Sequence, residues 1–323
     1  MIKYLFFILV TLLSGCTTDF SGLEKLEKSV YIRFSSHADV KADVEEAAYS
    51  RRTRGDEPPE HSVGILGIAT NEGLMTKTTL SGHKLESLCE WMANDVYYRD
   101  PNTGDIAHED DKKPSFPINK GSAIVVYAYM PHTEQVEFET DDCYIPINLR
   151  EDSATTDWRY SSKTAMSKAE YCNRENNTFT LDAFKHVMAC LDLVLYSFED
   201  PRSDIYMVIL EVDLIIKNGQ GRLSLVNGKV TMEDDAEPMH LKRRINKEFQ
   251  NGNSTHTERY YLLPHTEIDT IRIEGIWIDS RWNYIRHPFS HEYAIVDSVQ
   301  WNSENLRPGT CSTIRVKSLK YDR

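Results

Sequence analysis

"GSAIVVYAYMP", residues 121–131, places eight β-forming residues between a glycine and a proline. Valine, isoleucine and tyrosine pack well on the pleated surface of a sheet and are enriched in strands. An apolar run of this length between two turn residues predicts a buried strand. A buried strand needs neighbours on both edges, and the flanking sequence supplies candidates.

Two candidate strands precede this run. In "SVYIRFSS" (29–36), apolar and polar residues alternate, so Val30, Ile32 and Phe34 share one face of a half-buried strand. "SVGILGIAT" (62–70) is a second, more continuously apolar strand that is interrupted by glycine.

Further strands are predicted in the second half of the chain. In "DIYMVILEVDLIIKNG" (204–219), alternation places five apolar residues on one face: Val208, Leu210, Val212, Leu214 and Ile216. Asn227-Gly228 lies between β-forming residues and predicts a hairpin with a two-residue type I′ turn. "STIRVKSLKYDR" (312–323) predicts a last alternating strand.

The segment "DTIRIEGIWID" (269–279) predicts a strand with an irregularity at Gly275. The alternating apolar positions change parity there, from Ile271 and Ile273 to Ile276 and Ile278. One extra residue in a strand produces such a change, so a β-bulge is predicted at the glycine.

Helical patterns are sparse. Leu85, Leu88, Cys89 and Met92 have helical spacing, and residues 162–170 are long enough for two turns. Short strands separated by turn signals predict an all-β protein built from sandwiches. A chain of 323 residues is long for one core, so two domains are expected.

The N-terminus has the features of a lipoprotein signal peptide. Lys3 precedes ten largely apolar residues, too few to span a bilayer, and Ser14-Gly15 stands directly before Cys16. The small pair before the cysteine resembles the lipobox of bacterial lipoproteins. Cys16 is therefore predicted to be acylated, and two or three acyl chains would anchor the mature chain stably.

Charge and cysteine content exclude several classes of function. The net charge is −13 and there is no basic block, which argues against nucleic acid as a partner. The five cysteines after Cys16 show no zinc-like spacing, and their odd number leaves at least one free thiol: Cys89, Cys143, Cys172, Cys190 and Cys311. Export permits disulfides, but the sequence assigns no pairs. Cys190 lies in an apolar stretch and is interpreted as a small buried hydrophobic residue.

Histidines give no indication of catalysis or metal binding. His186 has no serine, cysteine or acid at a recognisable motif spacing and is interpreted as a structural histidine in or beside the core. His287 and His291 are four residues apart, but Pro288 argues against a helix that would bring them together.

One acidic loop partly matches a calcium-binding pattern. In "DPNTGDIAHEDD", Asp100, Asn102, Gly104 and Asp111 stand at suitable offsets, but Asp105 replaces the sixth-position glycine. A solvated loop is the preferred interpretation. With no GxSxG, HExxH or P-loop motif, neither an enzyme nor a cofactor or metal site is predicted.

The charged segment "ADVKADVEEAAYSRRTRGDEPPE" (38–60) predicts an exposed linker. It contains the cluster Arg51-Arg52-Thr53-Arg54, and exposed segments of this kind are where proteases cut. A solvated basic patch that balances nearby glutamates is an equally good interpretation.

Several segments in this order resemble the fimbrillin-like lipoproteins of Bacteroidetes, which include the subunits of type V pili. They are "VYIRFSS", Thr53-Arg54, "GILGIAT", "WMANDVYYRD", "KGSAIVVYAYMP", "TTDWRYSS", "FTLDAFKHVMACLDLVL" and "RYYLLPHTE". The most specific is "LDAFKHVMACLDL", in which Phe184, His186, Met188 and Leu191 match a family strand pattern.

The resemblance implies two tandem transthyretin-like Greek-key β-sandwiches. The expected divisions are a signal peptide (1–15), an N-terminal strand with the Arg-rich linker (16–60), a first sandwich (61–175) completed by strand 29–36, and a second sandwich (176–323). It also implies that an arginine-specific protease cleaves at Arg52 or Arg54 and frees the first strand.

The expected function is that of a structural, anchor or tip subunit of a fimbrium, or of a surface adhesin, lipid-anchored in the outer membrane. Its partners would be other subunits that donate strands, and host or bacterial surface ligands. The donor within this chain would be the last strand, through Ile314, Val316 and Leu319. The alternative is a lipid-anchored glycan-binding module, with sugars stacked on Trp158, Trp282 or Trp301.

Overall fold

The computed structural model describes residues 33–36, 61–70, 92–108, 123–139, 142–150, 154–165, 178–198, 205–233, 237–250, 254–279, 285–294 and 303–316. These residues form nineteen strands in four sheets and one short 3-10 helix, η4 (Ser303–Asn305). The prediction of an all-β protein is confirmed. In the described part of the chain, no helix has the length and apolarity that crossing a membrane requires.

The first sheet has eight strands. Their order is β10 (Lys185–His186), β8 (Arg159–Ala165), β5 (Ala123–Met130), β2 (Ser62–Thr70), β3 (Met92–Arg99), β4 (Asp105–Ala107), β1 (Arg33–Ser35) and β9 (Thr178–Thr180). The second sheet has the order β14 (Val230–Met232), β13 (Gln220–Ser224), β7 (Cys143–Asn148) and β6 (Glu137–Phe138).

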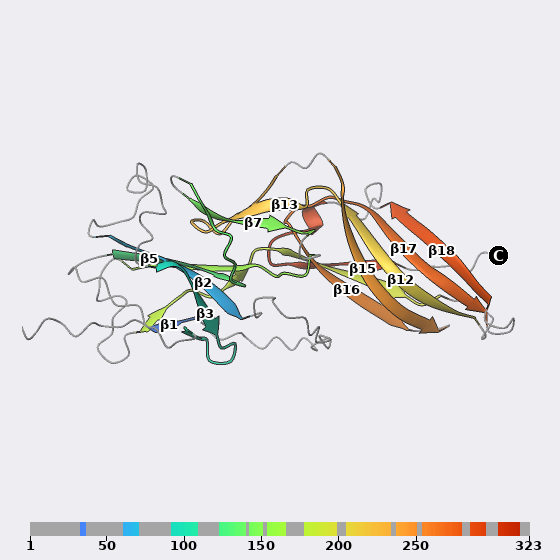
Figure 1. The fold of residues 1–323 in the computed structure, drawn as a ribbon, viewed down its shortest axis with the longest axis horizontal. Helices are drawn as coiled ribbons and strands as arrows, with labels where there is room; N and C mark the ends of the chain where they lie inside the picture. Colours follow the sequence, from blue (N-terminus) through green and yellow to red (C-terminus); the bar gives the residue numbers. More distant parts are fainter. Residues whose placement is uncertain are drawn as a thin grey trace, which may run out of the picture.

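Two further sheets come from the second half of the chain. The third has the order β16 (Thr255–Leu262), β11 (Ala189–Tyr196) and β19 (Cys311–Val316). The fourth has the order β15 (Met239–Gln250), β12 (Ile205–Ile216), β17 (Ile268–Asp279) and β18 (Ile285–Ala294). Figure 1 shows the first sheet at one end of the elongated molecule and the fourth at the other.

The central strands of the first sheet are buried on both faces. Every side chain described in β2 and β5, residues 62–68 and 124–130, is buried. One face belongs to a large core that the first sheet shares with the second, including Tyr127 and Ile145. The other face is enclosed because the sheet curls, so that β1, β4 and β9 cover Ile65 and Val126. We call this smaller cluster the half-barrel core.

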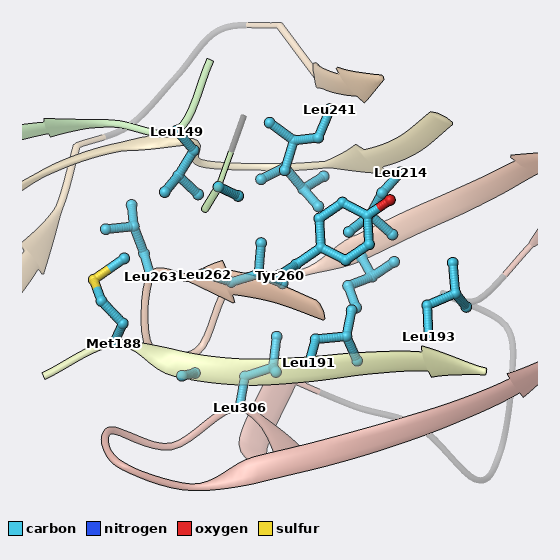
Figure 2. Close-up of a cluster of buried hydrophobic side chains, with 14 of the residues drawn as sticks. Leu149, Met188, Leu191, Leu193, Leu214, Leu241, Tyr260, Leu262, Leu263 and Leu306 are labelled. Atoms are coloured by element: carbon cyan, nitrogen blue, oxygen red, sulfur yellow. The ribbon is translucent and has the colours of Figure 1, made fainter. Parts of the chain in front are cut away.

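The large core continues from the first two sheets into the third and fourth. Figure 2 shows Tyr260 of β16 among leucines, including Leu191 of the neighbouring strand β11 and Leu214 of β12 in the fourth sheet. All three side chains are fully buried. The observed alternation in these strands therefore brings two apolar sheet faces together.

Strand pairing runs across the expected division at residues 175 and 176. Strand β7 pairs with β13, and β9 and β10 belong to the first sheet. The division into two transthyretin-like sandwiches stays a prediction. The strands predicted at 62–70, 121–131 and 204–219 are confirmed as β2, β5 and β12. The last predicted strand is confirmed as β19 as far as Val316, and residues 317–323 lie outside the described residues.

The predicted bulge is not at Gly275 but on the facing strand. Strand β17 keeps one parity from Ile271 to Asp279, on both sides of Gly275, and in β12 the register to both neighbours shifts between Ile209 and Glu211. The extra residue Leu210 moves Val208 to the opposite face from Val212, so the single face predicted for β12 is wrong. Gly275 is required instead by close packing, because a Cβ there would overlap the Phe289 ring and the Val208 carbonyl oxygen.

Two other local expectations are wrong. The hairpin between β13 and β14 has a longer loop than two residues, because Leu225 is buried and its N–H donates to the Cys143 carbonyl 2.8 Å away. In that loop Gly228 has a φ of +69°. Residues 162–165 are strand rather than helix, because β8 pairs along the whole of β5. Met92 begins β3, while Leu85, Leu88 and Cys89 lie outside the described residues.

Replacing Trp277 tests the observed parity of β17. Trp277 is 3% exposed, and its ring centroid lies 4.8 Å from that of Phe198, edge to face. Trp277→Ala should lower the free energy of unfolding by about 3–5 kcal/mol. Ile278→Ala, on the less buried face, should have a smaller effect in the same urea titration. The reverse order would contradict the observed burial.

Candidate functional site

The first described strand lies inside the first sheet rather than at its edge. Strand β1 pairs antiparallel with β4, where Phe34 faces Ile106, and parallel with β9, where Phe34 faces Phe179. Its segment is joined to β2 through residues 37–60, which include the Arg-rich cluster. A strand with two partners satisfies backbone groups on both of its edges, so its loss would open an edge on each neighbour.

Phe34 anchors this strand in the half-barrel core. Its side chain is 3% exposed and meets two other rings edge to face, with centroid distances of 5.8 Å to Tyr97 and 6.0 Å to Phe179. Arg33 on the other face is exposed. Burial of one phenylalanine contributes about 1.5–3 kcal/mol. The alternation predicted for this strand is confirmed for Arg33 and Phe34, and Val30 and Ile32 lie outside the described residues.

The end of β1 is fastened to the loop between β3 and β4. The Ser36 N–H donates to the Gly104 carbonyl 2.7 Å away, and the buried Arg99 donates from Nε to the Ser36 hydroxyl at 2.7 Å. This loop is the acidic segment that partly matches a calcium motif. Asp100 Oδ1 accepts the N–H of Asn102 at 2.7 Å, and these backbone hydrogen bonds lower the pKa of the carboxyl. The carboxylate therefore serves the turn, while Asp111 lies outside the described residues.

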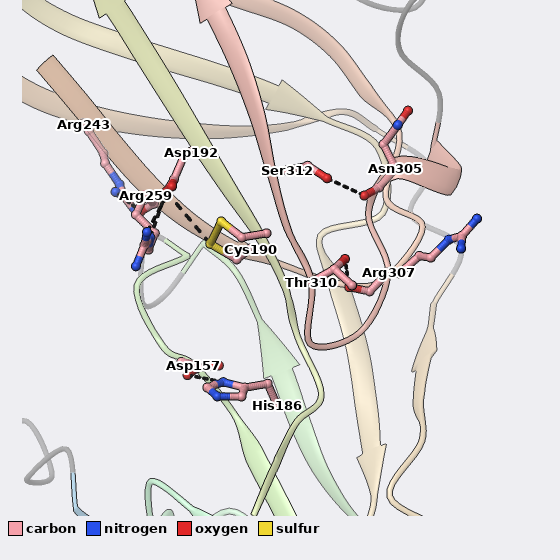
Figure 3. The surroundings of a disulfide bond; sticks show 11 residues. Asp157, His186, Cys190, Asp192, Arg243, Arg259, Asn305, Arg307, Thr310 and Ser312 are labelled. Atoms are coloured by element: carbon pink, nitrogen blue, oxygen red, sulfur yellow. Dashed lines mark hydrogen bonds and ion pairs between the residues drawn. A yellow bond between two sulfur atoms is a disulfide. The ribbon is translucent and has the colours of Figure 1, made fainter. Parts of the chain in front are cut away.

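The last strand is held covalently. Cys190 of β11 and Cys311 of β19 form a disulfide, and they are direct partners in the parallel register of these strands. Figure 3 shows the bond at the start of β19, next to the turn in which Thr310 donates to the Arg307 carbonyl. The interpretation of Cys190 as a buried hydrophobic residue is wrong. Alternation sends Leu191 into the core and turns Cys190 outward, toward Cys311.

The other face of β19 completes the core of the second half. Val316 is 5% exposed and Ile314 packs partly buried against the same cluster. Both residues were expected to act in strand donation to another subunit, and here they pack on the large core of their own chain. Leu319 lies outside the described residues. Strand β19 is at an edge of its sheet, so one of its sides has no strand partner among the described residues.

A cavity of about 530 Å³ opens between β3 of the first sheet and β6 of the second. It is lined by Ala93, Asn94, Asp95, Val96, His108, His132, Glu134, Val136 and Phe138. We call it the side cavity. The size is in the range of sites that bind small molecules, and the lining combines apolar with polar groups, as such sites do.

Asn94 forms a bulge at the wall of the side cavity. Ile65 pairs with Asp95 and Leu66 with Ala93, so Asn94 is an extra residue, and its φ is 65°. Asparagine is one of the few residues other than glycine that adopt this conformation readily. The side chain is held from both ends, since its Oδ1 accepts the Tyr129 hydroxyl at 2.5 Å and its Nδ2 donates to the Thr133 carbonyl at 2.9 Å.

His132 completes the wall next to the bulge. Its ring stacks on Tyr129 with an interplanar angle of 17°, and its Nε2 lies 3.3 Å from the Asn94 carbonyl oxygen. A carbonyl only accepts, so Nε2 carries the proton and a neutral ring presents Nδ1 as an acceptor. Burial lowers the pKa of His132, which keeps the ring neutral near pH 7.

Most of the residues singled out in the sequence do not meet at one site. Cys16, Arg51, Arg52, Arg54, Trp282 and Trp301 lie outside the described residues. His186 is on the edge strand β10 with a half-exposed side chain, and its Nδ1 is 2.7 Å from Asp157, which also accepts from Arg159. This is a surface ion-pair cluster and not part of the core.

The remaining predicted residues have structural surroundings. Trp158 is partly buried against the large core, with its ring 6.3 Å from that of Tyr129. His287 and His291 lie on strand β18, and the expectation that they do not share a helix is confirmed. Cys143 is buried and is not one of the two cysteines of the disulfide, and Cys89 and Cys172 lie outside the described residues.

Sequence reasoning missed the side cavity entirely. Asn94 lies within a run that otherwise predicts a strand, and an asparagine at such a position is the one local signal of a bulge. His132 and Phe138 follow the buried strand β5, but nothing in their spacing links them to residue 94. Only the packing of the second sheet on the first brings them together.

Comparison with known proteins identifies a similar fold. No protein-family model matches the chain, and no curated protein matches it significantly. Its structure resembles a candidate cell adhesion protein from Bacteroides ovatus, with a TM-score of 0.54 and 14% identity over 89% of this chain and 91% of the other. A candidate cell adhesion protein from Bacteroides uniformis has a TM-score of 0.48 and 13% identity over 89% and 94% of the two chains. At such identities the similarity concerns the fold alone.

Substitution of Phe34 tests the contribution of the first strand. Phe34→Ala should lower the free energy of unfolding by about 3–5 kcal/mol, because it leaves a cavity beside Phe179 and Tyr97. Arg33→Ala, on the exposed face of the same strand, should change it by less than about 0.5 kcal/mol. Urea unfolding measures both, and equal effects would show that β1 adds nothing to the core.

Proposed function

We propose that the chain is a non-enzymatic, cell-surface adhesin or fimbrial subunit, anchored to the outer membrane through a lipid on Cys16. It assembles by accepting a strand from a neighbouring subunit in the position of β1. The observation that carries the proposal is the placement of β1, a strand near the N-terminus inserted between β4 and β9. The similar fold of a candidate cell adhesion protein supports it.

Removal of β1 would create a defined vacancy. The backbone edges of β4 and β9 would both lose their partner, and Ile106 and Phe179 would lose contact with Phe34. Unpaired strand edges and exposed apolar surface both favour the entry of another strand. An incoming strand with the same alternation would restore both the backbone pairing and the apolar contacts by β-augmentation.

Cleavage in the Arg-rich linker would make the strand removable. As long as residues 37–60 connect β1 to β2, a displaced strand stays tethered and rebinds at a high effective concentration. Cleavage at Arg52 or Arg54 removes the tether and with it the high effective concentration of β1. A strand from another subunit can then compete with β1 for the place between β4 and β9, so cleavage of the linker would control assembly.

Because of the disulfide, this chain can accept a strand from another subunit but cannot donate its own last strand. Cys311 is bonded to Cys190 at the first residue of β19, so this end of the strand cannot leave its own sheet. Val316 and Ile314 would also have to leave the core. The chain therefore accepts a strand but does not donate its last one, which fits a subunit at the end of a filament rather than within it.

Cleavage with an arginine-specific protease tests the accepting role. We expect a cut at Arg52 or Arg54, followed by exchange of the first strand for a synthetic peptide of residues 312–323. Mass spectrometry and size-exclusion chromatography would show loss of the N-terminal fragment and gain of the peptide. The Arg51, Arg52 and Arg54→Ala variant should do neither. A cleaved protein that stays folded, keeps its fragment and ignores the peptide would contradict the proposal.

Removal of the disulfide tests the limit on donation. The Cys190→Ser, Cys311→Ser double variant should lose about 2–4 kcal/mol of stability. After cleavage at the linker it should form oligomers, whereas cleaved wild type stays monomeric in the absence of added peptide. Cys143→Ala, which replaces a cysteine outside this disulfide, is the matched control and should assemble as wild type does. Oligomers of cleaved wild type under oxidising conditions would show that the disulfide does not restrain donation.

A further inference from the structure

The side cavity has a built, rigid wall. Asn94 is locked in its positive-φ conformation by hydrogen bonds to Tyr129 and Thr133, and His132 is fixed by stacking on Tyr129. The backbone of His132 is fixed as well, since its backbone N–H donates to the Ser62 hydroxyl 2.9 Å away. Polar groups that are held in place in this way bind a ligand without a further loss of conformational freedom.

The lining divides into an apolar and a polar part. The apolar part is provided by Val96 of β3, Phe138 of β6, and Val136 directly before β6. Asn94 and His132 provide polar groups at the wall, and exposed Asp95 and Glu134 add two carboxylates at the mouth. Carboxylates only accept hydrogen bonds, so this site is rich in acceptors. A ligand that fits has one apolar face and a rim of hydrogen-bond donors.

We propose that the side cavity binds a saccharide ring that is neutral or carries an amine. The C–H face of the ring would lie on Phe138 and Val136. Its hydroxyl or ammonium groups would donate to the carboxylates of Asp95 and Glu134 and to the Asn94 region. A volume of about 530 Å³ accommodates one or two rings of this kind.

Charge excludes acidic sugars from this site. Asp95 and Glu134 place two negative charges at the mouth, and the whole chain carries a net charge of −13. His132 does not offset them, because burial lowers its pKa and the ring stays neutral at pH 7. A carboxylate-bearing sugar would therefore be repelled, whereas a neutral or cationic one is not.

This inference deepens the proposed adhesin function by naming a class of ligand, but it does not depend on strand exchange. The side cavity is formed by β3, β6 and residues near them, and none of its lining residues belongs to β1 or β19. Binding can therefore be measured on the uncleaved chain. Failure to bind a sugar leaves the assembly proposal standing, and failure to assemble leaves the sugar site standing.

A glycan array followed by calorimetry tests the site. The calorimetric probes are N-acetyl-lactosamine, mannobiose, a glucosamine disaccharide and 3′-sialyllactose. We expect at least one neutral or amino-bearing probe to bind and sialyllactose not to bind. Glu134→Gln and Phe138→Ala should each weaken binding about tenfold or more, through a lost charged acceptor and a lost ring contact. Glu237→Gln, an exposed glutamate outside the cavity, is the matched control.

Three outcomes would overturn the proposal. They are preferential binding of sialylated glycans, no binding to any neutral or amino-bearing glycan, and binding that both variants leave unchanged. Thermal unfolding of each variant shows whether it is folded, so that a loss of binding is assigned to the site. Binding of a lysine-bearing peptide in the side cavity, when sugars do not bind there, would also overturn the proposal and would identify the site as a protein-docking groove.

Discussion

Burial of β2 and β5 on both faces is the constraint on which the first half of the molecule depends. Residues 62–68 and 124–130 are apolar or small almost without interruption, and all of them are buried. One face is covered by the second sheet and the other by the curl of the first sheet itself. A strand that is apolar on both faces is unstable when either face is open to water, because each large aliphatic side chain left exposed forgoes about 1.5–3 kcal/mol of stabilisation by burial.

The first strand is part of that cover. Phe34 closes the half-barrel core together with Phe179 and Tyr97, so the N-terminal segment contributes to a core formed mainly by residues far along the chain. Such a strand is necessary for burial and, in the assembly we propose, replaceable, because another strand with the same alternation would pair with the same two edges and fill the same core. This combination links the stability of the fold to its proposed use in assembly.

The last strand has the opposite character. It lies at the edge of its sheet, where a strand could leave easily, yet a disulfide holds its first residue to β11. Strands β1 and β19 are therefore held differently. Strand β1 is inserted between β4 and β9 without a covalent bond to either of them, whereas β19 is joined to β11 by the disulfide. In a polymer built by strand exchange, a chain with this asymmetry would accept a strand from a neighbour but would not donate one.

The sequence by itself determined which segments form strands and which of their residues are apolar, because alternation and turn residues act over a few positions. It also indicated that residues 29–36 form a strand separated from the rest by a charged linker. Only the tertiary structure decided the bulge at Leu210 rather than at Gly275, the pairing of Cys190 with Cys311, and the meeting of Asn94, His132 and Phe138 at one cavity. These features depend on register and on the packing of one sheet against another, which join residues that no local pattern connects.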